Sequence, residues 1–257
     1  MTIYRRPDPI PRPTQKSVSA SKLEPIRESR TDLSTLAAQH IFSAIVSKNW
    51  AQTGLLPRED ILGEELSVSR TVVREAVKSL SSKSIVETKR RRGTAILNQS
   101  DWNFVDREMI GWMSASESFP DVGSQLINAL AMTQSSLLAQ ISERDLDTSA
   151  LREQARMIDG TPVEAAIAAL AFHRTAAQIV MNDFLLSLTT SMIYGLHAHH
   201  IEWLVQIGFG ANPQQYTALC DAIEAKDTDA IRTLNTEIFS NALPTVKDRR
   251  APAGVSM

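Results

Sequence analysis

Residues 69–82 read SRTVVREAVKSLSS, and this stretch points to the fold of the N-terminal part of the chain. Ser69 stands before the first turn, where a serine hydroxyl can accept a hydrogen bond from the free N–H groups of a helix start. Arg70 and Arg74 are four residues apart and share one helix face. Another face carries apolar residues at helical spacing, namely Val73, Ala76, Val77 and Leu80. The stretch predicts a helix over 70–82 with an anchoring face and a basic face.

Two helical patterns precede this stretch and a hairpin pattern follows it. Apolar residues recur at helical spacing from Leu33 to about Asn49, and Pro57 stands at the start of a short helix over 58–66. The apolar or β-branched runs 85–88 and 94–97 flank the basic tip Lys89-Arg90-Arg91-Arg92-Gly93, whose glycine suits a tight turn. Three helices followed by a basic hairpin are the plan of a winged helix-turn-helix.

A winged helix binds DNA by placing its last helix in the major groove with the first turn toward base edges. Arginine can pair with guanine O6 and N7, and serine or threonine can bond to a base or a phosphate. The residues expected there are Ser69, Arg70, Thr71 and Arg74, and the basic tip would add salt-dependent contacts. Taken alone, the arginine pair would suit a solvated helix face. The capping serine, the anchoring face and the hairpin in consecutive order favour DNA binding.

The rest of the chain predicts helices only. Helical patterns recur over 121–142, 149–158, 162–181, 183–206, 213–225 and 228–243. We therefore expect a mainly α protein in which a winged helix-turn-helix precedes an all-helical effector-binding bundle. The expected parts are a disordered basic arm (1–32), the winged helix (33–99), a linker (100–120), an effector-binding and dimerisation domain (121–247) and a disordered tail (248–257).

The charge is divided in the same way. The net charge is −2, but residues 1–100 carry 17 basic and 10 acidic residues, whereas residues 101–257 carry 10 and 19. A net +7 beside a net −9 is the asymmetry expected when only one module faces a polyanion.

Several classes of protein are excluded by composition and motifs. A single cysteine, Cys220, supports neither a disulfide scaffold nor a cysteine-rich zinc finger. No apolar run is long enough to span a bilayer, and the N-terminus lacks the apolar stretch of a signal peptide, so we expect a cytoplasmic protein without a membrane partner. Phosphate-binding glycine loops, nucleophile elbows and His-Glu-x-x-His motifs are absent, so an enzyme is not expected.

The segments LLPRE (55–59), VSRTVVREAV (68–77) and RGT (92–94) resemble the winged-helix signature of the GntR family of bacterial transcription regulators. The resemblance implies DNA contacts at Ser69, Arg70, Thr71, Val72 and Arg74, and at the wing tip Arg91-Arg92-Gly93. Asp60 stands where many relatives have an arginine, and Arg58 is expected to substitute for it. Val72 replaces a frequent proline or threonine, which changes a contact without removing the helix.

The helical half, with DAIEAKD at 221–227, resembles the FadR subgroup of this family, whose effector domain is called FCD. The segment WNFVD at 102–106, with Trp112, is similar to a pattern in regulators of sugar-acid catabolism, including the galactonate type. This similarity implies a sugar acid as effector. The alternative interpretation is a packed interdomain linker, because tryptophans there bury area whatever the effector is.

The family's metal site is not expected in this chain. The resemblance implies one aspartate and three histidines at positions that here hold Ala169, His173, Tyr216 and Ile238. One ligand of four remains, which does not provide the coordination that a transition metal needs, so no cofactor is expected. Gln134 stands where relatives place a carboxylate-binding arginine. The expected effector pocket comprises Gln134, His173, His197 and Tyr216; His197 and His200, three apart, are a weaker candidate metal pair.

These observations predict a regulator, expected to repress a catabolic or transport operon. A single winged helix reads few base pairs, so we expect a homodimer on a palindromic operator in double-stranded DNA, with a small-molecule effector. The alternative is the same DNA-binding module with a helical domain that has lost small-molecule and metal sensing and acts through a protein partner or constitutively.

Overall fold

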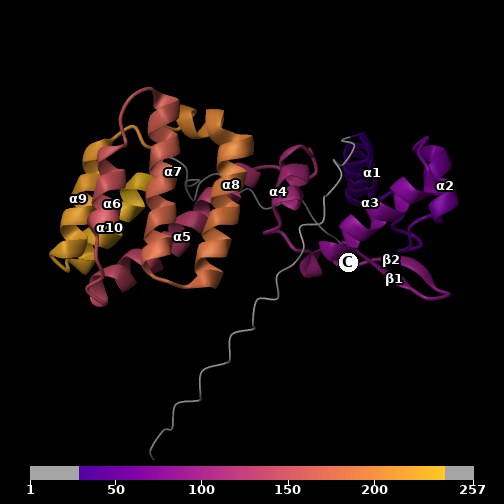
Figure 1. Cartoon of the computed structure of the whole chain (residues 1–257), viewed down its shortest axis with the longest axis horizontal. Helices are drawn as coiled ribbons and strands as arrows, with labels where there is room; N and C mark the ends of the chain where they lie inside the picture. Colours follow the sequence, from indigo (N-terminus) through magenta and orange to yellow (C-terminus); the bar gives the residue numbers. More distant parts are fainter. Residues whose placement is uncertain (1–28, 241–257) are drawn as a thin grey trace, which may run out of the picture.

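A computed structural model describes residues 29–240, and its two helical parts are joined through a short helix (Figure 1). The winged-helix elements gather at one end of the molecule and the bundle of longer helices at the other, with α4 (Arg107–Ser114) between them. The predicted fold class is confirmed. The tail at 248–257 and most of the proposed N-terminal arm lie outside the described residues.

The winged helix is built from three helices and a hairpin. Its elements are α1 (Ser29–Val46), α2 (Glu59–Glu65), α3 (Arg70–Ser82), β1 (Val86–Lys89) and β2 (Gly93–Ile96). The strands pair antiparallel, with Val86 opposite Ile96 and Lys89 opposite Gly93. The first helix begins at Ser29, four residues before the start predicted from the apolar pattern, so the described end of the 1–32 arm is helical.

The second part is a bundle of six helices. They are α5 (Val122–Glu143), α6 (Ser149–Arg156), α7 (Pro162–Ile179), α8 (Asp183–Gln206), α9 (Pro213–Glu224) and α10 (Thr228–Ser240). Local signals explain several boundaries: Thr161 and Glu164 form a reciprocal capping box at the start of α7, and Pro213 opens α9. No strand is present between residues 122 and 240.

The segment predicted as a linker (100–120) contains α4 and packs into the winged-helix core. Asp106 caps α4 by accepting a hydrogen bond from the backbone N–H of Met109 at 3.0 Å. Trp102 and Trp112 lie with their ring centroids 5.9 and 5.6 Å from that of Phe42 on α1. These buried rings join α4 to the core of the DNA-binding domain.

Candidate nucleic-acid interface and effector core

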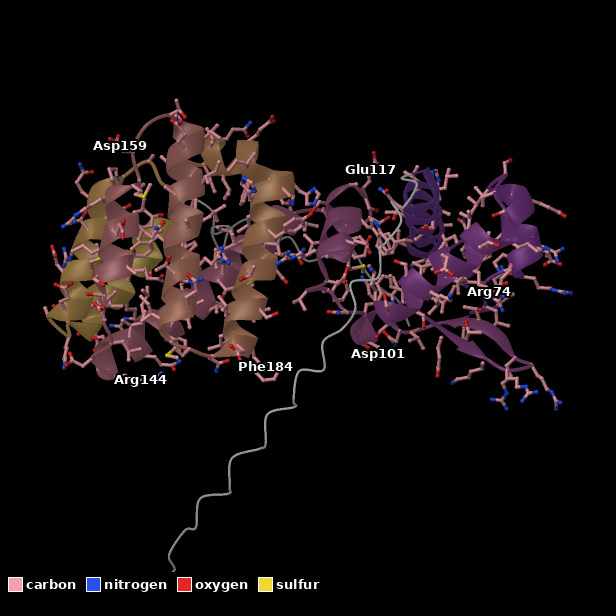
Figure 2. The ribbon with its side chains drawn as sticks, in the orientation of Figure 1. Arg74, Asp101, Glu117, Arg144, Asp159 and Phe184 are labelled. Atoms are coloured by element: carbon pink, nitrogen blue, oxygen red, sulfur yellow. The ribbon has the colours of Figure 1, made fainter. Side chains whose placement is uncertain are left out.

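The recognition helix α3 is anchored on one side and exposed on the other. Val73, Ala76, Val77 and Leu80 are buried against α1 and α2. Ser69 accepts a hydrogen bond from the backbone N–H of Val72 at 3.3 Å, as the sequence indicated for a capping serine. Arg70, Thr71 and Arg74 are exposed near the helix start (Figure 2 labels Arg74). Since burial anchors the opposite face, these three side chains are available to a groove of DNA.

The hairpin tip extends a second basic surface beside α3. Arg91 adopts φ 65° and Gly93 φ 86°, which gives the turn its left-handed geometry. Nitrogen-bearing side chains project from this end of the hairpin in Figure 2. Within the described residues, Arg70, Arg74, Arg91 and Arg92 form no salt bridge with an acidic side chain. Their positive charges are therefore free to meet phosphate.

Arg58 and Val72 have more constrained surroundings than the other proposed contact residues. Arg58 lines a shallow groove together with Arg70 and Gly93, so the structure brings α2, α3 and the wing together there. Its Nε lies 3.6 Å from Oδ1 of Asp60, and the Arg58 side chain is otherwise 83% exposed. Val72 is half-buried and packs against the winged-helix core, so only part of its side chain can contact DNA.

Lys83 ties α3 to α4, a contact that sequence reasoning missed. Its ammonium lies 2.6 Å from Oε2 of Glu108, 3.4 Å from Oδ1 of Asp106 and 5.1 Å from the ring centroid of Trp112. Lys83 is only 3% exposed. Its i, i+25 spacing to Glu108 follows no periodic pattern, so only the three-dimensional structure reveals this buried cation.

α4 contacts the bundle at a bend in α8. The backbone of His200 leaves helical angles (φ −133°, ψ 16°), and its Nε2 lies 3.0 Å from Oγ of Ser114 on α4. A Cβ atom at Gly195 would lie 2.6 Å from Cγ2 of Ile110, so the absence of a side chain there permits this close contact. Burial and the neighbouring His199 lower the pKa of His200.

The bundle interior brings three of the four predicted pocket residues together. Gln134 donates a hydrogen bond from Nε2 to the backbone oxygen of His173 at 2.9 Å, and the rings of His173 and Tyr216 have centroids 5.8 Å apart. All three side chains are buried. His197, the fourth, is exposed on α8 and does not join them, because the face of α8 that carries it is turned to solvent. The prediction of His197 as a pocket residue is therefore not supported by its position.

The buried polar groups in this interior are electrically neutral. Burial lowers the pKa of His173 from 6.5 to about 3, and burial raises the pKa of Tyr216. Ala169 and Ile238, the two other positions at which the resemblance implied metal ligands, are both buried. Within residues 29–240, no group of three or more His, Cys, Asp or Glu side chains could hold a metal ion.

The fold and these surfaces define a DNA-binding transcription regulator with a separate helical effector domain. Residues 33–96 match the gntR family of bacterial regulatory proteins, and residues 126–241 match the FCD domain. The chain belongs to the GntR family. Regulators of this family bind DNA, and FCD domains bind small-molecule effectors. No helix among the described residues is long and apolar enough to cross a membrane.

Two curated relatives come from Escherichia coli (strain K12). The chain is 41% identical over 91 residues to an uncharacterized HTH-type transcriptional regulator, YieP, a match that spans 35% of this chain and 40% of that regulator. It is 27% identical over 218 residues to the galactonate operon transcriptional repressor, covering 79% of this chain and 92% of the repressor.

A solved structure has a similar fold. It is that of Lar, which controls the expression of the Listeria monocytogenes agr system, and it superposes with a TM-score of 0.54 at 12% sequence identity. The superposition covers 85% of this chain and 96% of that one. At this identity the similarity concerns the fold alone.

Proposed function

We propose that this protein is a cytoplasmic repressor that binds a palindromic operator as a homodimer and changes its affinity for DNA when a small molecule binds the bundle. Its similarity to the galactonate operon repressor over most of both chains supports control of a catabolic or transport operon. The proposed DNA contacts are Arg58, Ser69, Arg70, Thr71, Val72, Arg74, Arg91, Arg92 and Gly93.

One observation carries the proposal, namely the exposed basic surface at the start of α3. Arg70 and Arg74 are exposed, while the apolar face of the same helix is buried. An arginine in the first turn of a recognition helix can pair with guanine, and the helix start favours phosphate. The wing arginines then add affinity without sequence preference, because they contact the charged backbone.

The route from effector to DNA runs through α4 in this proposal. The aromatic cluster and Lys83 hold α4 to the winged helix, whereas Ile110 and Ser114 contact α8 at Gly195 and His200. A ligand that favours one position of α8 would therefore shift the placement of the two winged helices in a dimer. Its differential affinity for the two arrangements sets the size of the response.

Electrophoretic retardation tests the proposal with an operator selected from random DNA by the full-length protein. Arg70→Ala and Arg74→Ala should each weaken specific binding at least tenfold, since a dimer loses the base contact in both half-sites and each contact contributes about 1–3 kcal/mol. Lys78→Ala is the matched control, because Lys78 is exposed on α3 but beyond the first turn and paired with Glu75. Unchanged operator affinity in both arginine variants, with normal helicity, would refute the assignment of α3.

Sedimentation with and without operator tests the dimer. Two protomers per palindromic site, with half-sites about one or two helical turns apart, are expected. A bound monomer would contradict the proposed symmetry.

A further inference from the structure

The groove between α2, α3 and the wing carries acidic as well as basic side chains. Its lining includes three of the proposed DNA contacts, Arg58, Arg70 and Gly93, together with the acidic residues Glu59 and Asp60. DNA that reaches both the first turn of α3 and the tip of the wing must pass over this groove. The two carboxylates therefore lie at a surface that faces a polyanion, where phosphate repels them.

Asp60 is the more firmly placed of the two acidic residues. It is the second residue of α2, and its Oδ1 accepts a hydrogen bond from the backbone N–H of Ile61 at 3.1 Å. The nearby guanidinium of Arg58 is 83% exposed and adds little to this hold. Glu59 is exposed, and among the described residues its carboxylate has no hydrogen-bond or ion-pair partner.

The carboxylate of Asp60 keeps an oxygen for a ligand. No hydrogen bond within residues 29–240 reaches its Oδ2, and the side chain is 35% exposed. A carboxylate only accepts hydrogen bonds, so a partner must donate to it. The structure thus holds an oriented acceptor beside the recognition helix.

DNA offers few donors to such an acceptor. Phosphate oxygens only accept, whereas the donors on base edges in the major groove are the N4 amino group of cytosine and the N6 amino group of adenine. Adenine is read best by an amide, which both donates and accepts, while aspartate and glutamate suit cytosine. The chemistry of the groove therefore favours cytosine as the partner of Asp60.

Arg70 supports the same direction of contact. It is the first residue of α3 and lines the groove together with Asp60, yet the two side chains form no salt bridge. Arg70 is free to pair with guanine O6 and N7, and Asp60 is free to accept from cytosine. One groove thus presents a donor for guanine and an acceptor for cytosine.

We propose that Asp60 is a specificity-determining residue that accepts a hydrogen bond from a cytosine amino group in each operator half-site. This inference rests on the proposed DNA surface and adds to it a residue of opposite charge. The carboxylate discriminates in two ways, because it binds cytosine in the operator and repels phosphate on DNA of any other sequence.

Selection from random DNA by the full-length wild type, Asp60→Asn and Asp60→Ala tests the contact. Asparagine keeps a side-chain oxygen for the N–H of Ile61, so the start of α2 should be preserved. The wild type should select cytosine at one position of each half-site. Asp60→Ala should accept any base there, and Asp60→Asn should favour adenine. The same selected sequence for all three proteins would overturn the proposal.

Affinities for the selected operator and for unrelated DNA of the same length give a second readout. Asp60→Asn should weaken operator binding about tenfold and strengthen binding to unrelated DNA about twofold, because a contact is lost and a negative charge is removed. Glu59→Gln is the matched control, since it removes the same charge from the same groove and should strengthen both affinities alike. Equal gains on both DNAs in Asp60→Asn would show that Asp60 only repels phosphate, which contradicts the proposal.

The variants Arg70→Ala and Arg74→Ala keep the two proposals apart. If they weaken operator binding while the Asp60 variants select the wild-type sequence, only the cytosine contact is refuted. If operator binding survives both arginine changes, the proposed DNA surface itself is wrong.

Discussion

The burial of His173 should make the stability of this protein depend on pH. The imidazole is fully buried and its two ring nitrogens have no partner, so its pKa is lowered from 6.5 to about 3. Between these two values the unfolded chain binds a proton at this position and the folded chain does not. Stability from His173 is therefore fully present above pH 6.5 and is lost as the pH falls toward 3.

The size of the effect follows from the shift. Each pH unit within this window corresponds to about 1.4 kcal/mol, so from pH 7.5 to 4.5 His173 should remove roughly 3 kcal/mol from the free energy of unfolding. Carboxylates also titrate in this range, and a reference variant must subtract their contribution. His173→Leu provides it, because an aliphatic side chain fills the site without a titrating group.

Urea unfolding of the full-length wild type and His173→Leu, followed by circular dichroism at pH 7.5, 6.5, 5.5 and 4.5, measures the difference. The difference in free energy of unfolding between the two proteins should change by roughly 3 kcal/mol in favour of the variant as the pH falls. His197→Leu, a change at an exposed histidine of the bundle, is the control and should run parallel to wild type. Parallel curves for His173→Leu and wild type would refute the argument that a neutral imidazole is buried here.

Three further changes test the winged helix and its junction with the bundle. Ser69→Ala removes the N-terminal cap of α3 and should lower the free energy of unfolding, measured in urea, by about 1 kcal/mol. Operator binding should also weaken. Unchanged stability would show that the cap contributes nothing. Lys83→Ala should lower the free energy of unfolding by about 2 kcal/mol, less than the loss of a fully buried ion pair because Glu108 is half-exposed. Lys83→Met should recover part of this loss, because its side chain still packs on Trp112. Equal stability of the two variants would count against this explanation. Gly195→Val places a side chain against Ile110 and should lower the free energy of unfolding by about 1–3 kcal/mol. Amide hydrogen exchange in α4 should become faster. An unchanged exchange rate would show that α4 does not depend on this contact.

Most helix boundaries could be predicted because their signals are local. The helix α3 begins and ends where Ser69 and the apolar spacing indicated, and the bundle helices follow the breaks at Pro162 and Pro213. The largest departure is α4, which was predicted as part of a linker. Eight residues provide barely two turns of periodicity, and the helix is held by rings on α1 and by Lys83, which are distant along the chain.

The candidate sites divide in the same way. The DNA-binding residues could be proposed from the sequence because a recognition helix and a wing concentrate them in short segments with their own motif. The burial of Asn235 could not be predicted, because a polar residue on an amphipathic helix is ordinarily exposed. Only the contact of α10 with α5 buries this side chain. His197, which the sequence placed with the pocket residues, is exposed on α8, because burial depends on which helix faces pack together and not on neighbouring residues.

By itself the sequence determined the class of protein, the order of its helices and the basic surface proposed to contact DNA, because helix periodicity, capping and charge are properties of neighbouring residues. Only the tertiary structure decided that α4 packs on both the winged helix and the bundle, that α8 bends at His200, and that Gln134 and Asn235 are buried in the bundle interior. Those features depend on which faces of distant helices bury one another, and hydrogen bonds between residues 39 to 104 positions apart leave no local pattern in the chain.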